Sequence, residues 1–416
     1  MIYKNLSSNE SLKLINSEHN YNIFLTGPPG SGKTWLTNQY IKNCKEHKKK
    51  IAITASTGIA SKLLNGTTIH AWSGIRVIDK KDSFDDILER VMLNRRKVLS
   101  WKKIQVLIID EISLLDLKTF TFLDMIGRKI RKNDKPFGGI RLLVVGDFFQ
   151  LPPISGNYIF HYEKWEEMFD YGINLTELYR STDIKLNKIL KRIRKGKTLT
   201  DKMINKLEKR ISNEIIFPML VPLRSMARKI NKDKLDSNTG IEHKYKAYYN
   251  YDKNKDTNSY MINIIQKQSS LEDELILKLG SPVINLVNDH SRKLMNGQVG
   301  KVIDFINDKP IVEFNNIPCI MEKHIWKKEI NGENVSMEQY PLLLCYSITI
   351  HRSQGQTLSQ ASMILDKNIW EKGQGYVALS RLQSLKGLHL IKFNPNIFKV
   401  DKDVKKYYRN WKKLKN

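Results

Sequence analysis

Short, mainly apolar runs recur in the first part of the chain. They occupy residues 23–26, 51–55, 106–109 and 142–145. A run without polar alternation is typical of a strand that is buried on both faces, as in a parallel sheet covered by helices. Residues 35–44, between the first two runs, have a helix-like pattern. The pattern therefore predicts an α/β fold built on a parallel sheet.

The later part of the chain has a different pattern. Residues 216–223 and 342–350 read as buried strands. Between them, residues 236–338 are polar and strand-like, with a hairpin signal over 299–314 around an Asn-Asp-Lys-Pro turn. Within this stretch, residues 246–259 are rich in Lys, Asn and Tyr, and we expect a loop or a solvated edge there. The pattern leaves open whether 236–338 is a folded unit or a poorly ordered insertion.

Two further helices are predicted outside the sheets. Ser83 is followed three residues later by Asp86, as at a helix N-cap, and apolar residues recur at helical spacing over 84–92. The tail from Asp401 is rich in lysine and has apolar residues, including Trp411, at helical spacing. We expect a terminal helix packed on the rest of the molecule, because Trp411 needs a partner; a free nucleic-acid arm is the alternative.

Composition adds size and charge to this picture. The chain has 416 residues, long enough for about two to four compact units. Its 70 Lys and Arg against 43 Asp and Glu give a formal charge of +27, which suits a polyanionic partner. Charge alone does not choose between DNA, RNA and an acidic membrane surface. Three scattered cysteines favour a reducing intracellular compartment, and no apolar run is long enough for a membrane span.

A phosphate-binding loop lies directly after the first strand. Residues 27–34 read Gly-Pro-Pro-Gly-Ser-Gly-Lys-Thr, between a predicted strand and a predicted helix. Glycines let backbone N–H groups approach phosphate oxygens, and the helix N-terminus adds positive potential there. The expected nucleotide ligands are Gly27, Pro28, Pro29, Gly30, Ser31, Gly32, Lys33 and Thr34. Lys33 is expected at the β- and γ-phosphates of ATP, and the Thr34 hydroxyl on Mg²⁺.

Acidic residues follow the third apolar run. Asp110 and Glu111 come at the predicted carboxyl end of a strand, where parallel sheets bind ligands. We expect Asp110 on the magnesium side and Glu111 as the base that orients and deprotonates the attacking water. An ordinary N-cap for the next helix is the alternative.

A series of later motifs narrows the class of nucleotide hydrolase. These are residues 53–60 (ITASTGIA), 66–72 (GTTIHAW), 110–116 (DEISLLD), 131–139 (RKNDKPFGG), 146–153 (GDFFQLPP), 175–180 (LTELYR), 350–357 (IHRSQGQT) and 375–381 (GYVALSR). In this order they closely resemble the petite-integration-frequency (Pif-type) DNA helicases, of the 5′-to-3′ branch of helicase superfamily one. The resemblance covers about residues 5 to 400.

The resemblance implies a division of the chain into α/β units. A first RecA-like parallel-sheet domain would span 1–178, with a duplex-splitting wedge insertion at 73–103. A second RecA-like domain would combine 179–235 and 339–416. A small β-barrel insertion would occupy 236–338 and help embrace the DNA. A plain connecting helix is the alternative for the wedge.

The resemblance also implies a motor and its catalytic residues. ATP and Mg²⁺ would lie between the two halves, and single-stranded DNA would lie across both, with 5′-to-3′ movement. Gln150 would sense the γ-phosphate or the attacking water, and Arg180 and Arg381 would be arginine fingers. Gln354 and Gly355 would lie beside the γ-phosphate.

The expected biological setting is correspondingly broad. The partners would be single-stranded DNA and fork or overhang duplexes, in DNA replication, repair or recombination, with the motor acting as a monomer. The alternatives are a single-strand translocase, an RNA-acting helicase, or a catalytically silent nucleic-acid-binding protein. The intact set of catalytic motifs argues against the last of these.

Eight residues of these motifs are the expected DNA contacts. They are Thr54, Ser56, Thr67, His70, Trp72, Thr349, His351 and Ser353. Hydroxyls hold phosphate oxygens without reading sequence, and Trp72 is expected to stack on a base. Core packing is the alternative for Trp72 and for the two histidines.

One departure from the family pattern bears on nucleotide choice. The family usually carries a Gln about 17 residues before the first loop glycine, where this chain has Glu10. A Gln amide both donates to and accepts from the adenine edge, whereas an ionised Glu only accepts. We therefore expect weaker discrimination of ATP from other nucleotides.

Overall fold

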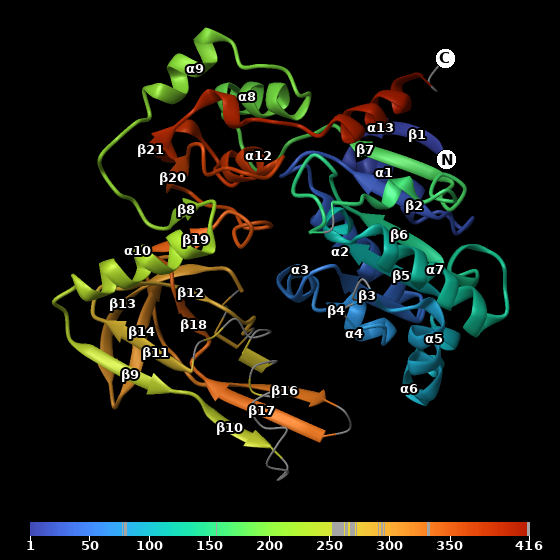
Figure 1. The fold of residues 1–416 in the computed structure, drawn as a ribbon, viewed down its shortest axis with the longest axis horizontal. Coiled ribbons are helices and arrows are strands. Elements are labelled where there is room, and N and C mark those ends of the chain that lie inside the picture. The colour runs from blue at the N-terminus through green and yellow to red at the C-terminus, as the bar shows by residue number, and fades with distance from the viewer. Residues whose placement is uncertain are drawn as a thin grey trace.

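The computed structural model describes residues 1–76, 78, 81–154, 156–251, 262, 265–266, 271, 273–289, 291–292, 294, 296–330 and 333–413. Figure 1 shows an α/β first part, an α/β second part beside it, and a β-rich part that extends from the second. Both ends of the chain lie together on the first part.

The first part is built on a seven-stranded parallel sheet. Its order is β1 (Ile2–Leu6), β7 (Tyr171–Leu175), β2 (Ile23–Thr26), β6 (Arg141–Val145), β5 (Val106–Asp110), β3 (Ile51–Ala55) and β4 (Thr67–Thr68). The four runs predicted as strands are confirmed as β2, β3, β5 and β6. Every residue of β5 and β6 is buried, which explains their unbroken apolar sequences.

Helices cover this sheet and fill its connections. They are α1 (Ser8–Ile15), α2 (Lys33–Glu46), α3 (Gly58–Leu63), α4 (Ile69–Ser73), α5 (Phe84–Leu93), α6 (Arg95–Lys103) and α7 (Leu117–Arg131), with short 3₁₀ turns η1 (Ile112–Leu114), η2 (Pro136–Gly138) and η3 (Ile159–His161). The predicted cap at Ser83 is confirmed, and it forms a reciprocal capping box with Asp86. Helices α5 and α6 lie within the predicted insertion at 73–103, whose role as a wedge stays a prediction.

The second part has a four-stranded parallel sheet in the order β19 (Ser347–Thr349), β8 (Met219–Val221), β20 (Ala361–Leu365) and β21 (Leu388–Phe393). Its helices are α8 (Ile184–Arg194), α9 (Asp201–Glu208), α10 (Arg224–Asp236) and α12 (Gln374–Leu379), with η4 (Leu385–Gly387) and η5 (Pro395–Ile397). The run at 342–350 was predicted as one strand, and this is wrong. It divides into β18 (Leu342–Leu344) and β19, which join different sheets.

The described residues of the β-rich part form three antiparallel sheets. A five-stranded sheet has the order β15 (Ile317–Ile320), β14 (Lys309–Phe314), β13 (Val299–Ile306), β12 (Pro282–Asn285) and β18. Strand β11 (Glu274–Lys278) pairs with β9 (Glu242–Lys246), and β17 (Glu333–Gln339) lies between β10 (Tyr248–Tyr251) and β16 (His324–Ile330). The hairpin predicted over 299–314 is confirmed as β13 and β14, whereas a closed barrel stays a prediction.

The polar stretch at 246–259 is only partly a loop. Residues 248–251 form β10, the edge strand of the sheet with β17 and β16, and its Tyr248 is 64% exposed, so the predicted solvated edge is confirmed there. Residues 252–259 lie outside the described residues.

The chain ends in α13 (Lys402–Lys413), the predicted terminal helix. Its Trp411 stacks on Tyr3 at 4.4 Å between ring centroids and meets Phe24 edge to face at 5.8 Å. The helix was predicted within the second half, yet it packs on the first sheet. Among the described helices, none has the length and apolar character needed to cross a membrane.

Candidate functional site

The phosphate loop connects the buried end of β2 to the start of α2. Gly30 and Gly32 have φ values of 78° and 86°, a left-handed backbone conformation that favours glycine. A Cβ on Gly30 would lie 2.4 Å from Cβ of Arg180, so glycine is also needed for the close approach of that arginine. The Lys33 ammonium donates to the carbonyls of Gly27 at 2.6 Å and Pro28 at 3.1 Å. Burial lowers the pKa of Lys33 to about 8.

Two carboxylates stand at the end of β5. Glu111 has a left-handed backbone with φ of 50°, and its N–H donates to Oδ1 of Asp110 at 2.8 Å. Burial, and then the neighbouring Glu111 carboxylate, raise the pKa of Asp110 to about 7. A bound divalent cation would offset the unfavourable ionisation of Asp110 beside Glu111. The Asp110 carboxylate and the hydroxyl of Thr34, which is exposed in the first turn of α2, are a donor set that fits Mg²⁺.

A residue of the second part contacts this acidic pair. The Gln354 Nε2 donates to Oε2 of Glu111 at 3.0 Å. The Gln354 side chain is almost completely buried, and within the described part of the chain its Oε1 has no hydrogen-bonding partner. Gln354 of the second part therefore contacts the predicted catalytic base, Glu111 of the first part. Gly355 follows with φ of 84° and faces α3, since its Cβ would lie 3.4 Å from Leu63.

Arg180 joins the phosphate loop to the second part. Its Nε donates to Oγ1 of Thr357 at 3.0 Å, and its Nη1 donates to the Ser380 carbonyl at 3.0 Å. The backbone N–H groups of Tyr179 and Arg180 both approach the Gly30 carbonyl, at 2.7 and 3.3 Å. Burial lowers the pKa of Arg180.

Arg381 is buried in the second part. It is 1% exposed, and it donates to the carbonyls of Val377, Ser353 and Gln356 and to the hydroxyl of Ser380. Burial, and then the charge of Arg180, lower the pKa of Arg381 to about 9. The structure therefore brings the two predicted arginine fingers near each other at the boundary of the two parts.

Gln150 lies just beyond β6, as predicted, and is buried. A residue that the sequence analysis missed packs against it: a Cβ on Gly373, at the start of α12, would lie 2.3 Å from the Gln150 carbonyl. Thr357, whose hydroxyl accepts from Arg180, was also missed, as was the ion pair between the buried Asp147 and the half-buried Arg194. Asp147 had one signal, its position directly after a strand in the same motif as Gln150.

Two of the predicted DNA contacts are wrong. Thr54 is completely buried, and its hydroxyl donates to the Ile108 carbonyl at 2.6 Å. Ser353 is also completely buried, and its hydroxyl donates to the Ile350 carbonyl at 2.8 Å. Each hydroxyl satisfies a backbone carbonyl inside the fold, so neither side chain reaches a ligand from solvent.

The other predicted hydroxyl contacts keep some exposure. Thr67 is exposed at the edge strand β4. Ser56 is half-buried, and its hydroxyl makes a long contact of 3.4 Å to the Asp110 carbonyl. Thr349 accepts from the Arg352 N–H at 3.3 Å.

The predicted aromatic and histidine contacts differ in their surroundings. Trp72 is half-buried and packs on Trp101 with 4.6 Å between ring centroids, so the core-packing alternative holds for part of its surface. Burial lowers the pKa of His70. His351 is exposed, with Nε2 3.0 Å from a Glu371 carboxylate oxygen, and its ring lies nearly parallel to Trp370. Trp370 is 65% exposed and was missed by the sequence analysis.

Glu10 has a local structural role. Its Oε2 accepts from the N–H of Ser7 at 2.8 Å and from the Ser7 hydroxyl at 2.7 Å, which completes a capping box at α1. These bonds to Ser7 lower the pKa of Glu10. Tyr179 lies nearby, with its hydroxyl 3.1 Å from that of Ser8 and its ring beside Gly32.

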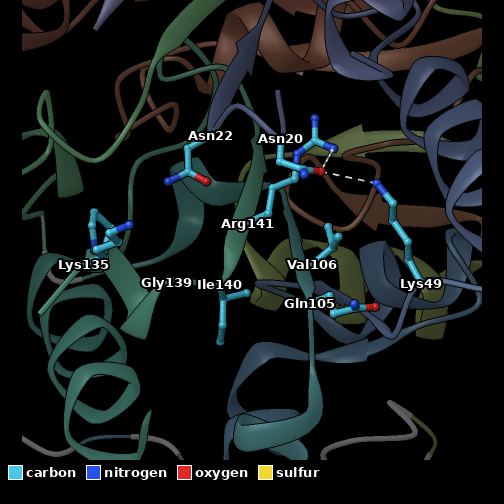
Figure 2. Close-up of a pocket in the computed structure, with 10 residues that line it drawn as sticks. Asn20, Asn22, Lys49, Gln105, Val106, Lys135, Gly139, Ile140 and Arg141 are labelled. Carbon is cyan, nitrogen blue, oxygen red and sulfur yellow. Dashed lines mark hydrogen bonds between the residues drawn. The ribbon is translucent and has the colours of Figure 1, made fainter. Parts of the chain in front are cut away.

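A cavity of about 330 Å³ lies on the side of the first sheet opposite the phosphate loop, at the ends where its strands begin (Figure 2). It opens where β5 and β6 begin, and Lys49, Lys135 and Arg141 are among its lining residues. Arg141 and Lys49 both donate to Oδ1 of Asn20. None of the predicted site residues lines this cavity, so it is separate from the candidate site.

The chain is similar to known DNA helicases over most of its length. Residues 7–213 match the family model described as PIF1-like helicase. The chain is 32% identical to the ATP-dependent DNA helicase Pif1 of Bdellovibrio bacteriovorus, and the match covers 94% of this chain and 89% of that relative. It is 30% identical to the ATP-dependent DNA helicase RRM3 of Saccharomyces cerevisiae, covering 95% of this chain but only 66% of that relative's length.

Solved structures show the same relationship. The Pif1 helicase from Candida albicans has a TM-score of 0.85 and 29% identity, with 99% of this chain and 100% of that chain covered. The Bacteroides Pif1 helicase in complex with ADP-AlF3 and single-stranded DNA has a TM-score of 0.71 and 25% identity, with 98% and 96% covered.

Proposed function

The chain belongs to the PIF1-like helicase family, and from this we propose that it is an ATP-dependent DNA helicase that moves 5′ to 3′ on single-stranded DNA. Its two parallel-sheet parts are taken as two RecA-like motor domains with the nucleotide between them. The observation that carries the proposal is the convergence of three elements: the phosphate loop, the Asp110–Glu111 pair, and Gln354 and Arg180 at the boundary of the two parts.

ATP binding would use the phosphate loop. Lys33 would transfer its ammonium from the carbonyls of Gly27 and Pro28 to the β- and γ-phosphates, which present stronger acceptors. Thr34 and Asp110 would hold Mg²⁺, which supplies positive charge at the phosphates. Glu111 would orient the attacking water, and Gln150 would report the state of the γ-phosphate.

Hydrolysis would require the two parts to close further. Arg180 already contacts both the phosphate loop and the second part, so it is close to the nucleotide before closure. Arg381 is bound by carbonyls of its own part, and its guanidinium would exchange these acceptors for phosphate oxygens on closure. An arginine finger of this kind is worth about a thousandfold or more in rate. The bond between Gln354 and Glu111 would couple closure to the position of the catalytic base.

DNA would lie across both parts. The proposed contacts that remain are Ser56, Thr67, His70 and Trp72 from the first part and Thr349 and His351 from the second. The formal charge of +27 supports a phosphate-backbone interaction that is independent of sequence. The insertion at 73–103 would act as the wedge, and the β-rich part would embrace the strand. The active species is proposed to be a monomer.

An unwinding assay tests this proposal. Duplexes with a 5′ overhang, a 3′ overhang or no overhang are compared in the presence of ATP and Mg²⁺, with matching RNA substrates. We expect ATP hydrolysis stimulated by single-stranded DNA and unwinding only from the 5′ overhang. The Lys33→Ala variant serves as the control, since it should lose hydrolysis and keep most DNA binding. Unwinding only from the 3′ overhang refutes the direction, and a preference for RNA refutes the substrate.

A further inference from the structure

Two helices far apart in the chain, α8 and α13, contact the ends of the strands β2 and β6, beside the phosphate loop. Strands β2 and β6 are neighbours in the first sheet, with Leu25 opposite Val145, and the Gly146 N–H donates to the Leu25 carbonyl at 3.0 Å. The residues at the ends of these strands, Thr26 and Gly27 on one and Asp147 on the other, are therefore adjacent. In Figure 1, α13 lies beside β1 and β7 of the first sheet.

Helix α8 contributes Arg194, which pairs with Asp147. The guanidinium binds the carboxylate through two nitrogens, with Nη2 to Oδ1 at 3.1 Å and Nε to Oδ2 at 3.3 Å. The Asp147 side chain is completely buried, and it also accepts from the Phe149 N–H at 3.2 Å. The guanidinium lies 4.7 Å from the ring centroid of Phe149 and 5.7 Å from that of Tyr408.

Helix α13 contributes Tyr408. Its hydroxyl lies 2.8 Å from Oγ1 of Thr26 and accepts from the Phe148 N–H at 3.4 Å. Its ring stacks on Phe149 with 4.6 Å between centroids and 16° between planes. The same tyrosine therefore contacts the last residue of β2 and the loop that follows β6.

These contacts lead directly to Lys33. Thr26 is bonded to Gly27, whose carbonyl accepts from the Lys33 ammonium at 2.6 Å. Asp147 is the strongest of the negative charges that hold the proton on this lysine against the effect of burial on its pKa. The cluster thus touches the phosphate loop both through the backbone and through charge.

We propose that Arg194 and Tyr408 are positioning residues for the phosphate loop: by fixing Asp147 and Thr26, they set where the Lys33 ammonium meets the phosphates of ATP. This inference rests on the proposed ATP hydrolysis. Neither residue is proposed to contact the nucleotide itself. Arg194 lies on α8, before the β-rich part, and Tyr408 lies on α13, after the motif that ends in Arg381. The two residues would therefore also transmit movements of the second part to the phosphate loop.

A matched pair of tyrosine variants separates positioning from packing. Tyr408→Phe and Tyr407→Phe each remove one hydroxyl from the same helix, but the Tyr407 hydroxyl accepts from Nε1 of Trp165 at 2.9 Å, inside the core. We expect Tyr408→Phe to lower kcat/KM for ATP about twofold to tenfold, the range for one lost hydrogen bond, and Tyr407→Phe to leave it unchanged. Similar shifts in Tm are expected for both. Equal effects of the two variants on kcat/KM overturn the proposal.

The ion pair provides a second, independent test. Arg194→Met leaves Asp147 buried and unpaired, and is expected to lower both Tm and kcat/KM. Adding Asp147→Asn removes the unpaired charge, and we expect Tm to recover while kcat/KM stays at least tenfold low. Recovery of both quantities means that the pair is only structural and overturns its positioning role. If the wild-type protein hydrolyses no ATP in the presence of single-stranded DNA, the proposed function itself is refuted, and this inference is refuted with it.

Discussion

Replacing Arg180 tests the arrangement of the candidate site most directly. The planar guanidinium makes two fixed bonds across the two parts, from Nε to Thr357 and from Nη1 to the Ser380 carbonyl, both at 3.0 Å. A lysine keeps the positive charge but cannot reproduce this fork. Two hydrogen bonds are worth about 1–3 kcal/mol together, so Arg180→Lys should lower kcat about fivefold to 150-fold. Arg180→Ala removes the charge as well and should lower kcat about a thousandfold or more.

The measurement is steady-state ATP hydrolysis with saturating single-stranded DNA, together with DNA affinity by fluorescence anisotropy. Arg409→Lys, at an exposed position on α13, is the matched control and should behave as wild type. DNA affinity should change little in any of the three variants. A kcat for Arg180→Lys equal to that of wild type refutes the argument from fork geometry. A loss below about tenfold for Arg180→Ala refutes the finger role itself.

Three further predictions follow from single contacts. The pKa of Asp110 is raised to about 7 in the folded protein, above its value of about 4 in an unfolded chain, so folding favours the protonated carboxyl. The contribution of Asp110 to the free energy of unfolding is therefore complete below about pH 4 and is lost as the pH rises through 7. Without Mg²⁺, Tm should therefore fall more over this pH range for wild type than for Asp110→Asn. Mg²⁺ with ATP should bind more tightly at pH 8 than at pH 6. Equal dependence of Tm on pH in the two proteins would contradict this. Glu10→Gln should increase the preference for ATP over GTP in hydrolysis assays, whereas Ser7→Ala, which removes the cap, should cost about 1 kcal/mol in urea unfolding; an unchanged preference refutes the base-reading role. Trp370→Ala should weaken single-stranded DNA binding about fivefold to 150-fold without a change in Tm, whereas Trp72→Ala should also lower Tm because Trp72 packs on Trp101; unchanged DNA affinity of Trp370→Ala removes that residue from the DNA surface.

Features set by short stretches of sequence were predicted well. The phosphate loop, its flanking strand and helix, and the cap at Ser83 depend on neighbouring residues, and the structure places each where the sequence indicates. The apolar runs of β5 and β6 identified buried strands because burial on both faces leaves no alternation.

Predictions that depended on distant partners fared worse. Thr54 and Ser353 were selected as DNA contacts because hydroxyls suit phosphates, but the fold gives each hydroxyl a backbone carbonyl instead. The run at 342–350 divides between two sheets, although nothing in its apolar sequence marks the break. One local contact was also missed: Glu10 was assessed against adenine alone, although Ser7, three residues earlier, forms a capping box with it.

The sequence by itself determined which groups carry the chemistry: a phosphate loop with Lys33, an acidic pair after a buried strand, and arginines in recognisable motifs. These follow from residue type and spacing, which are local properties. Only the tertiary structure decided which groups meet. It placed Gln354 on Glu111, Arg180 between the phosphate loop and the second part, and Tyr408 of the last helix on Thr26. These contacts join residues separated by more than a hundred positions, and they exist because packing the two sheets and the terminal helix brings distant segments to the same strand ends.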